Sequence, residues 1–354
     1  MHYDIIIIGA GPSGIVLGIM LQQKGLSVVI IDKCFFPRDK LCGGLLTIKS
    51  QTFLKSIVGD TDGFFKDIQG KRIEHINVVT KNDIMQYKKR FNPFIIVNRK
   101  DFDNALVLRY KSLGGAIYEG CRVQEIDYSN NNLKLSDGCM LSYRFLIGAD
   151  GIYSSIRKFV DPHYKPDGLC FESYIDDENP DFNKNTMYLL YNSYKYGYGW
   201  IFPREGDFVA GFGGTIGIHK QSSRFDSIIK SLGISAKYKS RHFAFGRFVK
   251  HPIKENVLLI GDAAGLADPI SGEGISYAFL SAKFAYRHVT AKKPNNAFIY
   301  RMKGIHYRIA IICFLRPFFY CLTPLRNLYF SIIWKKIGRL PFPPSGNRRI
   351  SKTH

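Results

Sequence analysis

The stretch Tyr3-Asp4-Ile5-Ile6-Ile7-Ile8-Gly9-Ala10-Gly11-Pro12-Ser13-Gly14 opens the chain and decides its fold. A short, mostly β-branched run that ends in glycine is typical of a buried parallel strand. Apolar residues then recur over residues 12–24 and Gly25 follows them, which predicts a helix that ends at that glycine. A second buried strand is expected over residues 27–31, directly before Asp32. The stretch therefore predicts a βαβ unit with a glycine-rich first turn.

The glycine-rich turn has the G-x-G-x-x-G spacing that receives a dinucleotide pyrophosphate. Glycines leave the backbone open to the phosphates, and the first turn of the helix offers free N–H groups and a positive dipole end. The carboxylate that ends the second strand, 18 residues after the last glycine, is placed to hydrogen-bond a ribose diol. The alternative is a tight turn without a ligand. The cofactor residues predicted from this unit are Gly9, Gly11, Pro12, Ser13, Gly14 and Asp32.

Two later glycine–acid motifs indicate which dinucleotide is bound. They are Gly148-Ala149-Asp150-Gly151 and Gly261-Asp262-Ala263-Ala264-Gly265, and each follows an apolar, strand-like run. The second aspartate is placed to hold a ribityl hydroxyl, and a helix expected over residues 274–290 would direct its N–H groups at the electron-rich edge of a reduced flavin. The first motif is also compatible with an ordinary turn. Together the motifs predict FAD, with further contacts from Asp150, Asp262, Gly274 and Ile275.

These elements predict an α/β fold in which a Rossmann-like FAD-binding domain is assembled from discontinuous segments, residues 1–70, 98–165 and 252–295. Short strands rich in glycine and aromatic residues predict an inserted, mostly antiparallel β-sheet substrate domain over residues 71–97 and 166–251, with a helix at 222–232. Residues 296–340 are expected to form a basic, apolar helical segment, and residues 341–354 a disordered tail.

The cysteine, histidine and charge content indicates which cofactors, cellular compartment and partners to expect. The seven cysteines are odd in number and form no C-x-x-C pair, and the nine histidines show no metal-ligand spacing. We therefore expect no metal, no disulfide framework and a reducing, cytoplasmic setting. The net charge of +21 is uneven, because residues 274–354 hold 15 lysines and arginines and no acid. A basic C-terminal quarter indicates a surface that faces an anionic partner.

Two further motifs carry a family resemblance. They are Phe36-Pro37-Arg38-Asp39-Lys40-Leu41-Cys42-Gly43-Gly44 and Tyr198-Gly199-Trp200-Ile201-Phe202-Pro203. Over residues 1–300 the chain resembles the geranylgeranyl reductase family of FAD-dependent oxidoreductases, which has the p-hydroxybenzoate hydroxylase-like flavoprotein fold. Flavin halogenases of this fold carry a W-x-W-x-I-P motif instead, which is absent here. The resemblance adds FAD contacts at Arg38, Cys42, Gly43, Arg99 and Val123, and it departs from the family at Asp32, often Glu, and at Leu41, often Pro.

The resemblance implies reduction of isolated C=C bonds in a polyprenyl (geranylgeranyl-type) chain on a lipid or diphosphate. Hydride transfer to such an alkene needs a proton at the other carbon and a site without water. Cys42 is the first candidate for the proton donor, although it is also compatible with a packing role beside Gly43. Tyr198 and Trp200 share one strand face with Tyr196 and Phe202, and would line a tunnel or form a core stripe. Tyr198 is an alternative proton donor.

The electron donor and two alternative functions stay open. No second dinucleotide loop is present, so NAD(P)H would dock transiently or a reduced electron carrier would serve. The first alternative is an FAD-dependent monooxygenase or hydroxylase of the same fold. The second is a flavin-containing peripheral membrane protein without prenyl reductase activity.

The C-terminal segment is apolar and basic but too interrupted to span a membrane. Its longest apolar run, residues 309–315, is far shorter than the about 20 residues that a spanning helix needs, and Arg308, Arg316 and Pro317 flank it. Short helices edged by Arg and Lys, with Trp334 before Lys335, favour an interfacial segment on the inner face of the cytoplasmic membrane. The alternative is a helical cap on the protein's own core. Nucleic acid is not expected as a partner, because no binding module accompanies the charge.

Overall fold

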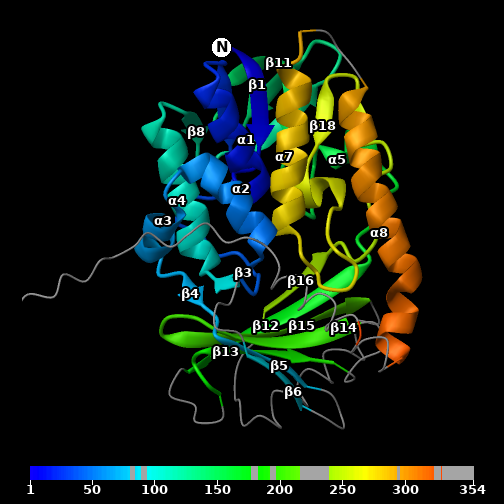
Figure 1. The fold of residues 1–354 in the computed structure, drawn as a ribbon. Helices are drawn as coiled ribbons and strands as arrows, with labels where there is room; N and C mark the ends of the chain where they lie inside the picture. The colour runs from blue at the N-terminus through cyan, green and yellow to red at the C-terminus, as the bar shows by residue number, and fades with distance from the viewer. Residues whose placement is uncertain are drawn as a thin grey trace, which may run out of the picture.

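The computed structural model describes residues 1–79, 84–88, 94–176, 182–191, 197–215, 239–292, 296–322 and 328 (Figure 1). The helix predicted at 222–232, the predicted tail at 341–354, Tyr196 and Trp334 lie outside the described residues. Within them the chain forms two large sheets and a small one, with helices packed around the first sheet.

The first sheet is mostly parallel and surrounds the N-terminal strand. β1 pairs in parallel with both β2 and β11, and β11 continues in parallel to β18. An antiparallel hairpin, β9 (Val123–Asp127) and β10 (Asn132–Leu135), extends from β11. The strands along the sheet are β17 (Ile253–Lys254), β18 (Val257–Leu259), β11 (Met140–Gly148), β1 (His2–Ile8), β2 (Val28–Ile31) and β8 (Ala116–Tyr118).

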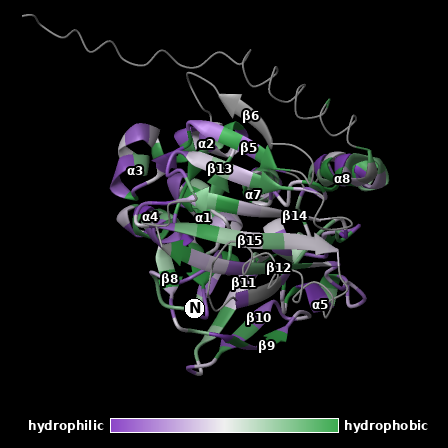
Figure 2. Cartoon of the chain, turned by 90° about the horizontal axis from the view of Figure 1, so that it is seen from below, coloured by the Kyte–Doolittle hydropathy of each residue, from purple (hydrophilic) through white to green (hydrophobic). Residues whose placement is uncertain are grey.

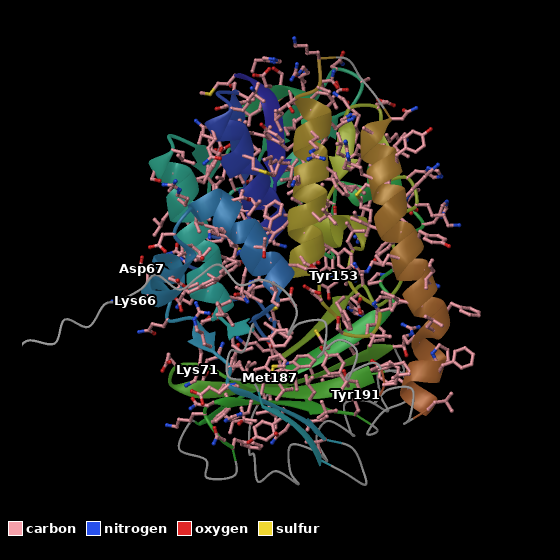
Figure 3. The ribbon with its side chains drawn as sticks, in the orientation of Figure 1. Lys66, Asp67, Lys71, Tyr153, Met187 and Tyr191 are labelled. Atoms are coloured by element: carbon pink, nitrogen blue, oxygen red, sulfur yellow. The ribbon has the colours of Figure 1, made fainter. Side chains whose placement is uncertain are left out.

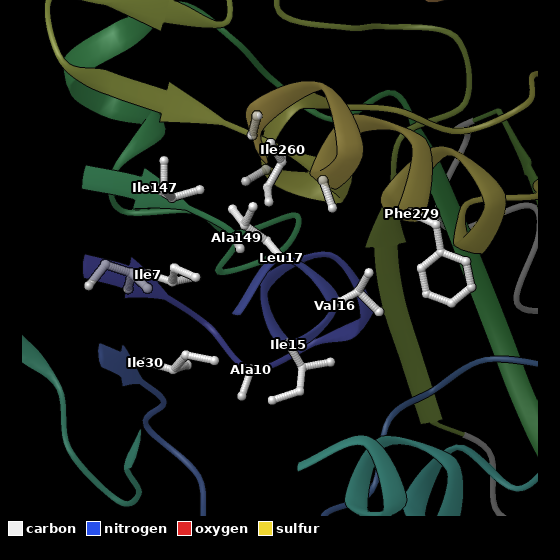
Figure 4. Packing of buried hydrophobic residues seen from close by; sticks show 14 of the residues in the cluster. Ile7, Ala10, Ile15, Val16, Leu17, Ile30, Ile147, Ala149, Ile260 and Phe279 are labelled. Carbon is white, nitrogen blue, oxygen red and sulfur yellow. The ribbon is translucent and has the colours of Figure 1, made fainter. Parts of the chain in front are cut away.

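The core lies between this sheet and its helices. Ile7, Ile30 and Ile147 stand on three neighbouring strands, and Val16 of α1 and Phe279 of α7 pack near them (Figure 4). All five side chains are fully buried, which explains why β1 is a continuous apolar run rather than an alternating one. The helices of this layer are α1 (Pro12–Gln23), α2 (Ile48–Val58), α3 (Thr61–Asp67), α4 (Arg99–Ser112), α5 (Arg157–Val160) and α7 (Ile275–Val289).

The second sheet is antiparallel except where β13 runs parallel to β5. It lies across one end of the first domain, which consists of the first sheet and its helices, and is viewed face-on in Figure 2. Its strands in order are β16 (Lys239–Phe243), β12 (Gly168–Asp176), β15 (Asp207–Thr215), β14 (Gly197–Pro203), β13 (Thr186–Leu190), β5 (His75–Val79) and β6 (Ile84–Lys88). The small third sheet comprises β3 (Leu45–Leu46), β7 (Ile95–Ile96) and β4 (Lys71–Arg72).

The predicted fold class is confirmed, but two local predictions are wrong. The expected short C-terminal helices are one helix, α8 (Ala297–Cys321), of 25 residues that continues through Pro317. Packing overrides the proline, because Phe319 and Tyr320 in the last turn are buried in an aromatic cluster and the Tyr320 hydroxyl donates to the carbonyl of Ile270. The sequence also predicts a short helix over residues 153–160, of which the structure forms only α5, from Arg157 to Val160.

Helices α2 and α3 were not predicted. Asp60 caps α3, since its carboxylate accepts hydrogen bonds from the backbone N–H groups of Asp62 and Gly63 at 3.0 and 3.1 Å. Among the residues that the structure describes, no helix is long and apolar enough to cross a membrane.

Candidate active site

The three glycine motifs meet at one edge of the first sheet. The N–H of Ala149 donates to the carbonyl of Ile8 at 2.8 Å, and the N–H of Ile260 donates to the carbonyl of Gly148 at 3.0 Å. Gly9 has a φ of +104°, and a Cβ there would lie 2.5 Å from the carbonyl oxygen of Ala149. Only glycine fits that position, so the first and second motifs are in direct backbone contact.

The first motif is tied to Asp32 and open at Gly11. The Asp32 carboxylate accepts from the N–H groups of Ala10 at 2.8 Å and Cys34 at 2.9 Å. A Cβ on Gly11 would meet nothing closer than the Arg38 guanidinium, at 3.8 Å. The N-terminus of α1 therefore faces a space that is bordered by a cation, the arrangement that a pyrophosphate requires.

Arg157, which no sequence motif contains, joins the second motif to the third. Its buried guanidinium donates to the carbonyls of Asp262 at 3.3 Å and Ala263 at 3.0 Å, and to the carbonyl of Ile152. Burial lowers the pKa of Arg157. The Asp150 carboxylate accepts from the backbone N–H and hydroxyl of Ser155. Arg157 and Asp150 thus hold the turns in place.

Two arginines share one buried carboxylate on α4. Arg99 donates to both oxygens of Asp103 at 2.8 Å, and Arg38 lies 3.5 Å from the same carboxylate. Burial is the largest single influence and would lower the pKa of Arg99, but the interactions with Asp103 and Cys42 together outweigh burial and raise it. Cys42 contributes to this rise, so the Arg99 cation lies within electrostatic reach of the thiol.

The segment that contains Cys42 reaches the third motif as well. Lys40 lies 3.7 Å from the Asp262 carboxylate, and a Cβ on Gly274 would lie 3.5 Å from an oxygen of that carboxylate. Asp262 is 41% exposed, so its free oxygens face the space before the first residue of α7, Ile275. One carboxylate thus faces both a loop cation and a helix N-terminus.

One face of the second sheet packs against the Cys42 loop. A glycine in the sheet and another in the loop allow the Trp200 ring to fit between them. Glu172 on β12, Gly211 on β15 and Trp200 on β14 are aligned across three adjacent strands. A Cβ on Gly211 would lie 2.2 Å from the indole, so the Trp200 ring lies over this glycine. A Cβ on Gly43 would lie 3.0 Å from the indole nitrogen, which places the Cys42 loop against the same ring.

Glu172 is the buried acid of this face. It is 2% exposed, and its Oε2 accepts from the N–H of Cys42 at 2.9 Å. Burial raises the pKa of Glu172 to about 7, against the backbone hydrogen bond from Cys42 and the positive charges of Arg204 and Arg99. The Glu172 carboxyl therefore keeps its proton to a higher pH than an exposed glutamate does. A lone acid in the apolar strand LCFESYI was the available sequence signal.

The aromatic residues of β14 are confirmed on one face but are mostly buried. Trp200 and Phe202 are 8% and 3% exposed and belong to one apolar cluster. Tyr198 stacks on Tyr191 at 5.4 Å and donates its hydroxyl to the carbonyl of Ser271. Burial raises the pKa of Tyr198, so its proton is held more tightly than that of an exposed tyrosine.

A family comparison decides the cofactor. Residues 2–207, more than half of the chain, match the model of the family described as FAD binding domain. The chain belongs to this FAD-binding family. FAD is accordingly its cofactor, as the glycine motifs predicted.

Related proteins share modest identity with this chain over most of its length. An uncharacterized protein of Methanosarcina barkeri is 28% identical and covers 94% of this chain and 87% of its own length. The digeranylgeranylglycerophospholipid reductase of Methanothrix thermoacetophila is 25% identical, over 80% of this chain and 77% of its own. A geranylgeranyl bacteriochlorophyll reductase-like structure from Thermoplasma acidophilum superposes with a TM-score of 0.74 at 18% identity, over 96% and 88% of the two chains. The structural likeness shows the fold.

The residues fit FAD by their unused polar groups. Within the described part of the chain, three buried side-chain atoms of this region have no hydrogen-bond partner, namely Trp200 Nε1, Glu172 Oε1 and Asp150 Oδ1. Buried polar atoms are normally paired, so these three atoms are available to a polar ligand. Together with the open backbone at Gly11, these atoms mark the side of the fold that receives FAD.

The predicted site residues fall into three groups in the structure. The first is the loop at residues 9–14 with Asp32 and Arg38, and the second joins Cys42, Gly43 and Arg99 to the face of Tyr198 and Trp200. The third is Asp262 with Gly274 and Ile275. Val123 begins β9, is half-buried, and packs against the apolar core. The structure adds Glu172, Asp103, Lys40 and Arg157.

Proposed function

We propose that this protein is an FAD-dependent reductase that saturates C=C bonds of a polyprenyl chain carried by a lipid or a diphosphate. The observation that carries the proposal is the contact between the Cys42 loop and the sheet face of Trp200 and Glu172. That contact combines a thiol, a buried acid and apolar walls in one place. The digeranylgeranylglycerophospholipid reductase among the relatives supports the same class of substrate.

FAD would be held by the loop at residues 9–14, Asp32, Arg38 and Asp262, with α7 directing its N-terminus at the isoalloxazine. FAD when bound supplies the hydride for one alkene carbon, and its electrons come from NAD(P)H or a reduced electron carrier. The two-electron balance is simple, because one hydride and one proton convert each C=C bond to a CH–CH bond.

The protein must supply the proton at the second carbon. In our proposal the thiol of Cys42 donates it, and the guanidinium of Arg99 stabilises the negative charge left on sulfur. Glu172 hydrogen-bonds the backbone of Cys42 and holds a proton near neutral pH, so it is placed to restore the thiol. Trp200 and Phe202 exclude water from the reacting carbons.

The test is reduction of a geranylgeranyl lipid by the purified protein under anaerobic conditions, with dithionite as the electron source. Mass spectrometry should show a gain of two hydrogens per double bond. Cys42→Ser should lower the rate by about 100-fold or more, the scale of a lost general acid. Cys139→Ser, at a half-buried cysteine beside the β10–β11 turn, is the matched control and should keep full activity.

The same material separates the proposal from a monooxygenase. A reductase leaves the substrate without added oxygen and should show no substrate-stimulated oxygen consumption in air. If the lipid gains a hydroxyl and oxygen uptake rises with it, the prenyl reductase proposal is wrong. Lipid analysis of cells with and without the gene extends the test to substrates that were not supplied.

A further inference from the structure

Helix α8 has apolar residues on two sides. Phe298, Met302, Ile305 and Ile309 follow a spacing of four, three and four residues and are buried against the first domain. Helix α8 lies at the edge of the molecule in Figure 1, and it carries a second, exposed stripe of apolar side chains. We call it the outer stripe, and its members are exposed: Tyr300, Tyr307, Ile311, Phe314, Leu315, Phe318 and, just after the helix, Leu322.

The outer stripe is too apolar for an ordinary helix surface. Phe314 is 74% exposed and Tyr307 is 71% exposed, and they lie two turns apart on the same side. Scattered apolar residues are normal on protein surfaces, but a continuous row marks an interaction face. Because both sides of the helix are apolar, packing on the protein's own core explains only the inner one.

The charge around the outer stripe has one sign. Lys303 and Arg308 are exposed on α8, and no acidic residue occurs anywhere in residues 274–354. Two described carboxylates, Asp167 and Asp268, act electrostatically on Cys313 of α8. Both accept backbone hydrogen bonds elsewhere, Asp167 from Phe245 at 2.7 Å and Asp268 from Ser271 at 2.8 Å. The outer stripe therefore combines exposed apolar side chains with exposed cations.

We propose that α8 lies in the plane of an anionic lipid bilayer, with the outer stripe inserted at the headgroup boundary. Aromatic and aliphatic side chains would enter the interface while Lys303 and Arg308 contact lipid phosphates. A second copy of this chain is disfavoured as the occupant, because two such surfaces would face each other with like charges. The proposal concerns binding and does not depend on the proposed reductase chemistry.

Docking in this way would place the bilayer beside the aromatic cluster of the second sheet. Phe319 and Tyr320, in the last turn of α8, contact Tyr191 with ring centroids 5.7 and 6.2 Å apart. Tyr191, seen near the lower end of α8 in Figure 3, in turn stacks on Tyr198. A row of aromatic rings thus connects the outer helix to the face of Trp200.

The test is sedimentation of the full-chain, FAD-loaded protein with phosphatidylcholine vesicles, with and without phosphatidylglycerol. We expect binding to the mixed vesicles that weakens as salt is raised. Phe314→Ser should weaken the partitioning by about tenfold, since a largely exposed phenyl ring no longer enters the interface. Leu108→Ser on α4, 56% exposed on a helix of the first domain, is the matched control and should bind normally.

The charge contribution needs its own pair of variants. The double change Lys303→Gln and Arg308→Gln should weaken binding to the mixed vesicles by about tenfold. Lys66→Gln on α3, on the far side of the molecule from α8 in Figure 3, should have no effect.

Three results would overturn the proposal. One is no sedimentation of the full chain with either vesicle. Another is equal loss in the Phe314→Ser and Leu108→Ser proteins. The third is a dimer in solution that Phe314→Ser dissociates while vesicle binding is absent, which would assign the outer stripe to a second copy of the chain. Vesicle binding by a protein that reduces no prenyl lipid would leave this inference intact and remove only the proposed activity.

Discussion

Replacing Glu172 by glutamine should remove a pH dependence from the stability of the folded protein. Burial raises the pKa of Glu172 to about 7 in the folded chain, from the ordinary value of 4.5. The folded state therefore holds a proton that the unfolded state releases between these two values. Below pH 4.5 the buried carboxyl does not lower the free energy of unfolding. As the pH rises it lowers that free energy increasingly, and the loss levels off above pH 7. The difference between the two pKa values corresponds to about 3 kcal/mol.

Urea unfolding of the FAD-loaded protein at pH 5 and pH 8 measures this cost. Part of this loss of stability has already developed at pH 5. Linkage therefore predicts that, between pH 5 and pH 8, the free energy of unfolding falls by about 2.5 kcal/mol more in the wild type than in Glu172→Gln. Glutamine keeps an acceptor for the N–H of Cys42, so the loop geometry is retained. Other titrating groups occur in both proteins and cancel in the comparison. Glu74→Gln, at an exposed glutamate, is the control.

Equal pH profiles for the wild type and Glu172→Gln would refute the reasoning, because they would mean that the carboxyl is ionised in the folded state at pH 5. A larger loss in the glutamine variant would refute it as well. Either result would also remove Glu172 as a proton store beside the thiol.

Three further outcomes are expected. Gly211→Ala places a Cβ 2.2 Å from the Trp200 ring and should cost about 1–3 kcal/mol in urea unfolding, whereas Gly213→Ala on the same face finds ordinary contacts and should cost less than about 1 kcal/mol; equal costs would mean that the indole does not lie over Gly211. Burial lowers the pKa of His306 to about 4, so wild-type thermal stability should fall as the pH drops from 6.5 toward 4, and His306→Leu should flatten that part of the profile. Arg99→Met leaves the buried Asp103 carboxylate without its bidentate ion pair and should lower the free energy of unfolding by about 3 kcal/mol. Adding Asp103→Asn should restore part of that loss.

Local patterns in the sequence predicted the first βαβ unit well. Four consecutive isoleucines before Gly9 leave few alternatives to a strand buried on both faces, and the glycine spacing then fixes the turn. The cap of α4 is equally local, since Asn98 accepts a hydrogen bond from the N–H of Lys100. These features depend on neighbours within a few residues of each other.

Features that depend on contacts between residues far apart in the sequence were not predictable. Glu172 becomes a buried acid at the Cys42 loop only because β12 pairs with β15 so that Glu172 faces Gly211. Arg157 has no motif, and its role follows from carbonyls about a hundred residues further along the chain. Helix α8 passes through Pro317 because distant residues pack on its last turn. In each case the deciding partner is far away in the sequence.

The place of β1 in the first sheet sets the order in which the protein can be completed during synthesis. β1 is made first, but its partner β11 ends at Gly148 and the third motif ends at Gly265. At about 5–20 residues per second, about 10–50 s separate the first glycine motif from the last. For about the first half of that interval, until β11 is made, the isoleucines of β1 have no second neighbour strand. FAD is therefore bound late in synthesis. A chain truncated before α7 lacks part of the FAD site.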